Sequence, residues 1–317
     1  MSDLVTFGET MLRLSPPTGE RLEQASRFDV HAAGAESNTA VAAERLGAVS
    51  TWISKLPDSP LGRRVVNELR GYGIDVDVVW DDDGRQGTYY LEHAGEPRGT
   101  NVIYDRTDAA VTTATAEELP AAHIRDARLF YTSGITPALS NTLRETTATL
   151  LRAAGEAGTR TALDVNYREK LWTPAEARKT LLRLFEYLDV LFLATKDARR
   201  VLDYEGEPRQ LAHSLANEYD IETVVVTQGE HGALAISDGV LHEQGVFSAE
   251  TLDPIGTGDA FVGAFLARRL SGDGVERALE MAAATASLKR TIGGDVATVT
   301  QAEVEAVVRD GERGVRR

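Results

Sequence analysis

The stretch DPIGTGDAFVGAFLARRL, residues 253–270, carries the strongest fold signal in the sequence. A turn containing Gly256 and Gly258 leads into a helical pattern that begins at Asp259. A glycine turn at a helix N-terminus presents backbone N–H groups and the positive end of the helix dipole, so it can bind an anion. We therefore expect Gly256, Thr257 and Gly258 to bind a phosphate beside the carboxylate of Asp259. The string also fits an ordinary helix start, because aspartate is common in first turns.

Strand-like and helical patterns alternate along the chain. The strand patterns cover residues 4–9, 50–56, 128–134, 159–166, 190–194 and 223–229. The helical patterns cover residues 37–46, 61–72, 140–157, 174–188, 209–219 and 259–270. Ser140 is a candidate N-cap for its helix, and Gly158 a candidate stop. The alternation predicts an α/β fold with a mostly parallel central sheet and helices on both faces.

Two segments, residues 10–32 and 87–106, break this pattern. Both contain short strand-like runs separated by turns rich in glycine and proline. They could pair as a small separate sheet that covers a cleft as a lid, or they could be unrelated surface hairpins. Because no repeat or low-complexity linker divides the chain, we expect one domain over residues 1–317 with a lid formed by the two insertions.

Composition excludes several classes of function. The 317 residues include no cysteine, so disulfides, thiolate nucleophiles and cysteine metal sites are excluded. A net charge of −15 argues against nucleic acid and anionic membranes as partners. Such a surface suits a cytoplasm of very high salt, although an ordinary acidic enzyme also fits. With no signal-peptide pattern and no apolar run of transmembrane length, we expect a cytoplasmic protein.

Polar residues follow several of the predicted strands, where ligands bind in α/β sheets. They lie at residues 133–134, 164–168, 227–229 and 256–259. Phosphoryl transfer needs positive potential around the phosphate and a base for the attacking hydroxyl, and the glycine turn with Asp259 could supply both. A dinucleotide fingerprint fits less well because Phe261 occupies its third glycine position. The sequence contains no Walker A motif.

Three motifs together resemble the ribokinase-like (PfkB) carbohydrate kinase family. DPIGTGDAFVGAF resembles the signature near the C-terminus of these kinases, and GAESNTAVAAERLG, residues 34–47, resembles their other signature. VVTQGEHGAL, residues 225–234, resembles their nucleotide-binding strand and turn. The resemblance runs from the FGE strand to TIGGD at residues 291–295. It implies a three-layer α/β/α domain with a β-sheet lid and ATP-dependent phosphorylation of an alcohol.

The resemblance also implies roles for individual residues. Asp259 would be the catalytic base, and Gly256, Thr257 and Gly258 the anion hole. Gly34 and Asn38 would face the sugar hydroxyls. The residues implied beside the nucleotide are Asn166, Arg168, Thr227, Gly229, Gly232, Gly256 and Gly258. ATP implies Mg²⁺, but no metal-binding cluster is visible and no metal ligands are assigned. Asp253 and Ile255 match positions near a monovalent-cation site of the family, so a potassium requirement is a further expectation.

The sequence departs from the family pattern in two places. A common N-x-x-E motif, whose glutamate helps to organise magnesium and phosphate, is replaced here by Thr195-Lys196-Asp197-Ala198. An asparagine on the adenosine side is replaced, by Ala283 in MAAATASL. Neither change removes the proposed base or the anion hole.

Three details favour an acidic sugar as the acceptor. Tyr104 and Arg106 are two residues apart on a predicted strand, so they share a face. Arg168 follows a strand end, where it could also reach the ATP phosphates, and at least one residue of the pair Tyr89-Tyr90 should face inward. A guanidinium pair with a tyrosine suits a carboxylate. The combination resembles the 2-keto-3-deoxygluconate kinases of the family, in which Gly34, Tyr90 (or Tyr89), Tyr104, Arg106, Ile135, Arg168 and Asp259 would surround the substrate.

The predicted reaction is transfer of the ATP γ-phosphate to the terminal (C6) hydroxyl of 2-keto-3-deoxygluconate. The sequence does not distinguish this acceptor from its galactonate epimer. The alternatives are a neutral-sugar kinase of the fructokinase or ribokinase type and a non-catalytic nucleotide- or sugar-binding regulator. Because a lid sheet has edges that need covering, we also expect a homo-oligomer, either a dimer through the lids or a higher assembly.

Overall fold

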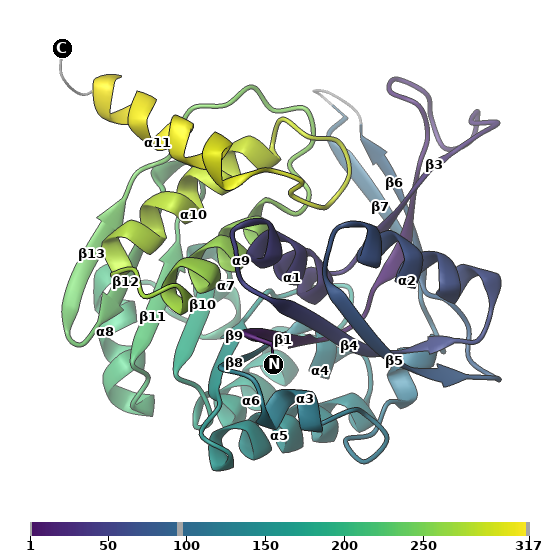
Figure 1. Ribbon diagram of the computed structural model, residues 1–317, viewed down its shortest axis with the longest axis horizontal. Helices are drawn as coiled ribbons and strands as arrows, with labels where there is room; N and C mark the ends of the chain where they lie inside the picture. Colours follow the sequence, from purple (N-terminus) through teal and green to yellow (C-terminus); the bar gives the residue numbers. More distant parts are fainter. Residues whose placement is uncertain (1, 94–97, 315–317) are drawn as a thin grey trace.

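The computed structural model describes residues 2–93 and 98–314, and its central feature is a nine-stranded sheet (Figure 1). The strand order is β13-β12-β11-β10-β9-β8-β1-β4-β5. The bounds are β1 (Leu4–Phe7), β4 (Ser50–Pro57), β5 (Asp75–Asp81), β8 (Leu129–Ser133), β9 (Arg160–Asp164), β10 (Val190–Ala194), β11 (Thr223–Thr227), β12 (Ala233–Ser237) and β13 (Val240–Gln244). All neighbours from β5 to β11 pair in parallel, and β12 and β13 are antiparallel. The predicted mostly parallel sheet is confirmed.

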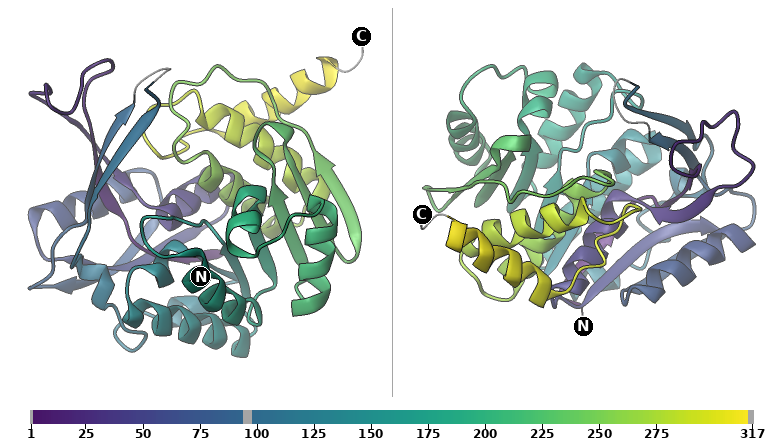
Figure 2. Two further views of the ribbon diagram at one scale, coloured as in Figure 1. Left: turned by 180° about the vertical axis from the view of Figure 1, so that it is seen from behind. Right: turned by 90° about the horizontal axis from the view of Figure 1, so that it is seen from above.

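Helices cover both faces of this sheet, as the alternating pattern predicts (Figures 1 and 2). The long helices are α1 (Ala35–Arg45), α2 (Pro60–Gly71), α5 (Asn141–Glu156), α6 (Pro174–Phe185), α8 (Pro208–Tyr219), α9 (Thr257–Leu270), α10 (Val275–Lys289) and α11 (Gln301–Gly314). The short ones are η1 (Ala110–Thr113), α3 (Ala122–Arg125), α4 (Ile135–Ala138), α7 (Thr195–Val201) and η2 (Gly229–His231). None of the helices in the described ranges is both long and apolar enough to cross a membrane.

Alternate residues of β11 pack in two different apolar cores, one on each face of the sheet. Val224 and Val226 of β11 pack in the core that contains α5, α6 and α8. Val225 packs on the other face, in the core formed with α1, α9, α10 and α11. Because successive side chains of a strand point to opposite faces, both faces must be apolar for the sheet to be buried between helices. This explains the continuous apolar runs from which the strands are predicted.

The two segments that break the alternation form one four-stranded sheet, in the order β3-β2-β6-β7. The strands are β2 (Met11–Ser15), β3 (Asp29–Ala33), β6 (Thr88–His93) and β7 (Thr100–Asp105). Parallel pairing of β2 with β6 joins the two segments, with Arg13 opposite Tyr89. Figure 2 shows this small sheet projecting beside the main α/β layers. The predicted pairing of residues 10–32 with 87–106 is confirmed.

Several element boundaries and some whole elements differ from the prediction. Ser140 caps α5 as expected, since its hydroxyl accepts a hydrogen bond from the N–H of Leu143 at 3.0 Å. The helix predicted to end at residue 188 ends at Phe185. The elements that the pattern did not indicate include β5, β12, β13, α10 and α11. Most residues of α10 are buried, so it lacks the polar stripe by which an amphipathic helix is recognised.

Candidate active site

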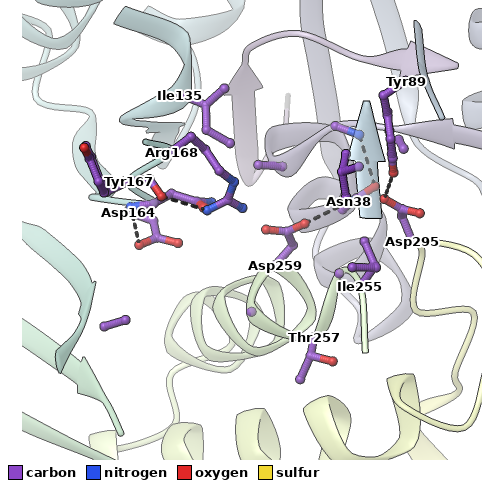
Figure 3. A pocket seen from close by; sticks show the side chains of 18 of the residues that line it. Asn38, Tyr89, Ile135, Asp164, Tyr167, Arg168, Ile255, Thr257, Asp259 and Asp295 are labelled. Carbon is purple, nitrogen blue, oxygen red and sulfur yellow. Dashed lines mark hydrogen bonds between the residues drawn. The ribbon is translucent and has the colours of Figure 1, made fainter. Parts of the chain in front are cut away.

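A cavity of about 740 Å³ lies beyond the carboxyl ends of the central strands, between them and the small sheet (Figure 3). Asp164 at the end of β9, Ala194 at the end of β10 and Thr227 at the end of β11 line it. It brings together most of the residues predicted from the sequence. These are Gly34, Asn38, Tyr89, Tyr104, Arg106, Ile135, Asn166, Arg168, Thr227, Gly256, Thr257, Gly258 and Asp259.

The glycine turn at the start of α9 is shaped for close approach of backbone groups. Gly256 has a φ of +78°, and a Cβ at this position would lie 1.8 Å from the carbonyl oxygen of Asp295. Only glycine fits both restrictions. The N–H groups of Gly258 and Asp259 have no protein partner within the described ranges, as is usual in a first helical turn. The turn therefore offers free donors to an anion in the cavity.

Asp259 stands on this first turn and is held by a residue from another helix. The side-chain amide of Asn38, on α1, donates a hydrogen bond to Asp259 Oδ2 at 2.8 Å (Figure 3). Burial raises the pKa of Asp259 to about 7, while this hydrogen bond and the charge of Arg168 act in the opposite direction. A carboxylate with a pKa near neutrality is suited to accept a proton from an alcohol. Asn38 lines the cavity but is already engaged in orienting the carboxylate.

The small sheet supplies one wall of the cavity through alternate residues. Tyr104 and Arg106 both line it, as their spacing predicts. Of the tyrosine pair, Tyr89 faces the cavity and its hydroxyl donates to Asp295 Oδ2 at 2.6 Å. Tyr90 is not among the described residues that line the cavity, and its ring lies 6.0 Å from that of Phe28. Because adjacent strand residues point to opposite faces, the cavity lining favours Tyr89 over Tyr90 for the predicted substrate contact.

Arg106 is paired with a buried carboxylate in this wall. Its Nη2 forms an ion pair with Glu9 Oε2, and the two side chains are only 10% and 4% exposed. Burial raises the pKa of Glu9, and the charge and hydrogen bond of Arg106 oppose this shift. Among the described residues, Arg106 Nε and Glu9 Oε1 have no hydrogen-bond partner. A buried donor and a buried acceptor without partners mark a place for a polar ligand.

Sequence reasoning missed Glu9, although it belongs to the FGE string of the first strand pattern. The only signal was a charged residue directly after an apolar strand. Its partner Arg106 is distant in the sequence, so no local pattern joins the two residues.

A second wall carries more charge than the sequence suggested. Arg168 Nη1 donates to the carbonyl of Tyr167 at 3.2 Å, and Arg168 forms no ion pair with any residue in the described part of the chain. Burial and the charges of Asp197 and Asp259 raise the pKa of Asp164 to about 8, while Arg168 lowers it. Further cations line the cavity without having been predicted. These are Lys170, Lys196 and Arg200.

Two of the glycines expected beside the nucleotide have a different position. Thr227 lines the cavity, but Gly229 and Gly232 are not among the lining residues that the structure describes. Gly232 has a φ of +90°, and a Cβ there would lie 2.0 Å from the carbonyl oxygen of Gln244. Its role in the structure is to shape the turn between β11 and β12. The place of these two glycines beside the nucleotide stays a prediction.

The altered segment at residues 195–198 begins α7 and borders the cavity through Lys196 and Asp197. Asp197 is buried and accepts a hydrogen bond from the N–H of Tyr167 at 3.3 Å. The described residues contain no cluster of three or more His, Cys, Asp or Glu side chains that could hold a metal ion. Asp164 and Asp197 are nevertheless neighbouring carboxylates at the cavity surface.

Comparison with known proteins decides the family. Residues 1–302 match the pfkB family carbohydrate kinases. The chain belongs to this family. It is therefore an ATP-dependent carbohydrate kinase, and the cavity with Asp259 on the anion-binding turn is its candidate active site.

Two relatives and one solved structure show where this kinase stands within the family. It is 60% identical over 316 residues to a 2-dehydro-3-deoxygalactonokinase of Haloferax volcanii, covering 100% of this chain and 99% of that one. It is 33% identical to a 2-dehydro-3-deoxygluconokinase of Thermoproteus tenax, covering 93% and 90% of the two chains. The crystal structure of a 2-dehydro-3-deoxygluconokinase of Thermotoga maritima superposes with a TM-score of 0.92 at 33% identity, covering 98% and 100%. The expected ribokinase-like fold is confirmed.

Proposed function

We propose that this kinase transfers the γ-phosphate of ATP to the terminal (C6) hydroxyl of a 2-keto-3-deoxy sugar acid. Both kinds of relative carry names for such acceptors, since 2-dehydro and 2-keto denote the same carbonyl. The greater similarity to a galactonokinase favours the galactonate epimer as the better substrate. The neutral-sugar alternative has no comparable support among these relatives.

The observation that carries the proposal is the buried pair of Arg106 and Glu9 in the cavity wall. Arg106 keeps an unused Nε–H, and Glu9 keeps an unused carboxylate oxygen. A sugar acid could offer a carboxylate to the guanidinium and a hydroxyl to Glu9, which satisfies both groups. A neutral sugar offers the guanidinium only hydroxyl and carbonyl oxygens, which form weaker hydrogen bonds than a carboxylate.

Asp259 and Arg168 act at the other end of the substrate. The C6 hydroxyl gives its proton to Asp259, its oxygen bonds to the γ-phosphorus, and the bond to the bridging oxygen of ADP breaks. The free N–H groups of Gly258 and Asp259 stabilise the charge on the phosphate during transfer. Arg168, whose charge already acts on Asp259, is assigned to the same phosphate because the carboxylate lies at the far end of a six-carbon chain.

ATP and Mg²⁺ are the cosubstrate and cofactor that the family implies. Bound Mg²⁺ neutralises phosphate charge, and it prefers oxygen ligands while keeping several of its waters. Asp164 and Asp197 offer such oxygens at the cavity surface, so they fit a water-mediated contact. Thr227 at the end of β11 and Lys196 in the first turn of α7 are assigned to the nucleotide side.

The small sheet formed by residues 10–32 and 87–106 is assigned as a lid within a single domain of residues 1–317. Its closure over the cavity would exclude water and limit hydrolysis of ATP. The exposed sheet edges favour a homodimer through the lids. A cytoplasmic enzyme adapted to high salt agrees with the net charge of −15.

The test is a coupled ADP-release assay with Mg-ATP in high potassium chloride. The acceptors are 2-keto-3-deoxygalactonate, 2-keto-3-deoxygluconate, gluconate, fructose and ribose. We expect kcat/KM for the two keto acids to exceed that for the neutral sugars by about 100-fold or more, the discrimination that an unsatisfied buried group produces. A preference for fructose or ribose would overturn the acidic acceptor. Binding of ATP without turnover on any acceptor would favour the regulator alternative.

A further inference from the structure

The ammonium group of Lys289 is fully buried directly behind the anion-binding turn. Lys289 is the last residue of α10 and has 0% of its surface exposed. Its Nζ donates hydrogen bonds to the backbone carbonyls of Ile292 at 3.0 Å and Asp253 at 3.3 Å. Burial lowers the pKa of this group, while the Asp253 and Asp295 carboxylates oppose the shift. A buried charge is costly, so it is retained only where its partners hold it.

These carbonyls belong to the two loops that fix the position of the anion turn. One loop, residues 253–256, leads into α9, and the other, residues 292–295, follows α10. The carboxylate of Asp253 accepts from the N–H of Ile255 at 3.0 Å and from the N–H of Gly294 at 3.1 Å. The carbonyl of Asp295 fills the space beside Gly256. A shift of either loop would therefore move the N–H groups that face the phosphate.

The small sheet is tied to the same two loops. Arg13 of β2 pairs with Asp253 at 2.8 Å and with Asp295 at 2.6 Å, and Tyr89 of β6 donates to Asp295. The cluster thus contains two buried cations, Arg13 and Lys289, and two buried carboxylates. Removing Lys289 would leave a buried excess of negative charge next to a turn whose task is to attract an anion.

The family resemblance implies a potassium ion beside Asp253 and Ile255, and the structure shows why this implication does not fit. Backbone carbonyls are the ligands by which proteins hold potassium. Here the carbonyl of Asp253 is already bound by the Lys289 ammonium, which has the same charge. We propose that Lys289 is a built-in monovalent cation that holds the two loops in register, so that phosphoryl transfer does not require free potassium. Lys289 is a positioning residue, because it acts through the loops and does not touch the reacting atoms.

The first experiment uses the unaltered enzyme and exchanges the cation at constant ionic strength. The turnover number is measured in potassium, sodium and choline chloride, since the acidic surface needs equal screening in all three. We expect kcat in the three salts to agree within about twofold, because Lys289 already supplies the monovalent cation and the three salts screen the surface equally. A kcat that collapses in choline and returns with added potassium would overturn the proposal. The measurement can use any acceptor that the enzyme phosphorylates. A wrong assignment of the acceptor would therefore not affect the outcome of this test.

The second experiment removes the Lys289 ammonium by substitution and adds a monovalent cation to the buffer in its place. Lys289→Ala should lower kcat in choline by roughly 10- to 100-fold, because a small misplacement of catalytic groups is costly. Potassium or ammonium should restore part of this loss, while the KM for the acceptor changes little. Lys289→Met, which fills the space with an apolar chain, should show no such rescue. A purely structural role would give no cation-specific recovery.

The matched control is Lys179→Ala, which removes an exposed lysine on α6 and should leave kcat unchanged in every salt. Thermal unfolding of each variant in choline and in potassium shows whether it is folded. If Lys289→Ala is folded and keeps full kcat in choline, the proposal is wrong. If the variant does not fold, the cation exchange on the unaltered enzyme still decides the question.

Discussion

Two regions that face the same cavity are built in different ways. One is the glycine turn at residues 256–258 (the anion turn), and the other is the cavity wall formed by the small sheet (the lid wall). The turn and its base come from four consecutive residues, 256–259, so a single string sets their spacing. The lid wall combines Tyr89 of β6 and Arg106, which follows β7, with Glu9 from the connection between β1 and β2, and pairing across the fold sets their spacing. If the proposed roles are right, this difference predicts that the reaction chemistry is encoded locally, whereas the choice of acceptor is encoded by tertiary contacts.

The largest expected effect tests the local element. Asp259→Asn keeps the shape and can still accept the Asn38 hydrogen bond, but it cannot take a proton. We expect kcat to fall by roughly 10²- to 10⁴-fold, the usual contribution of a general base. ATP affinity, measured by calorimetry, should be largely retained. Equal losses of turnover and of ATP binding would show that Asp259 supports the nucleotide and is not the base.

The next effect tests the lid wall. Arg106→Ala should raise the KM for a keto-acid acceptor by roughly 10- to 100-fold, because charge-assisted hydrogen bonds contribute about 1.5–3 kcal/mol. The KM for a weak neutral acceptor should change much less. Arg106→Lys is the control, since it keeps the charge but loses the planar fork. If both kinds of acceptor suffer equally, Arg106 serves only to neutralise Glu9.

The pH dependence sharpens the same contrast. With a pKa of about 7, Asp259 must lose its proton to act as the base, so kcat/KM should fall about tenfold per pH unit below 7. No group of the wall that holds the acceptor takes part in this proton transfer, so the fall should appear with keto-acid and neutral acceptors alike. A rate profile that is flat between pH 5.5 and 8 would contradict the assigned base.

The contribution of Asp259 to the free energy of unfolding should fall as the pH rises, whereas kcat/KM should rise. The folded pKa of Asp259 lies above its ordinary value of 3.8, so the folded state binds an extra proton between these values and loses this stabilisation as pH rises through 7. Asp259→Asn should therefore unfold at a higher temperature than the unaltered enzyme at pH 8, and the gap should shrink at pH 5.5. Thermal melts at the two pH values measure this difference.

The smallest effect separates the two adjacent tyrosines. Tyr89→Phe removes one hydrogen bond to Asp295, so we expect a several-fold loss of kcat, corresponding to about 1 kcal/mol. Tyr90→Phe changes a residue that contacts Phe28 on the other face and should have no effect on turnover. Equal losses of kcat in the two variants would contradict the assignment of Tyr89 alone to the cavity side of the small sheet.

Several site features could be predicted from the sequence because they depend on short spacings. Tyr104 and Arg106 share a face since they are two residues apart on a strand, and the structure bears this out. The choice between Tyr89 and Tyr90 could not be made, because a shift of one residue in strand register exchanges the two faces. Gly229 and Gly232 were expected beside the nucleotide but are not among the described residues that line the cavity, so this placement stays a prediction.

The amino-acid sequence was sufficient to predict the α/β alternation and the glycine turn at the start of α9, and it supplied Asp259 as the proposed base. These follow from backbone geometry within one turn of helix or one strand, which neighbouring residues are sufficient to set. Only the tertiary structure decided that Glu9 pairs with Arg106 and that Lys289 is buried against Asp253 and Ile292. The contacts of Glu9 with Arg106 and of Lys289 with Asp253 join segments that are distant in the sequence. They depend on how the loops close in space, since a buried charge is stable only where the fold brings its partner to it.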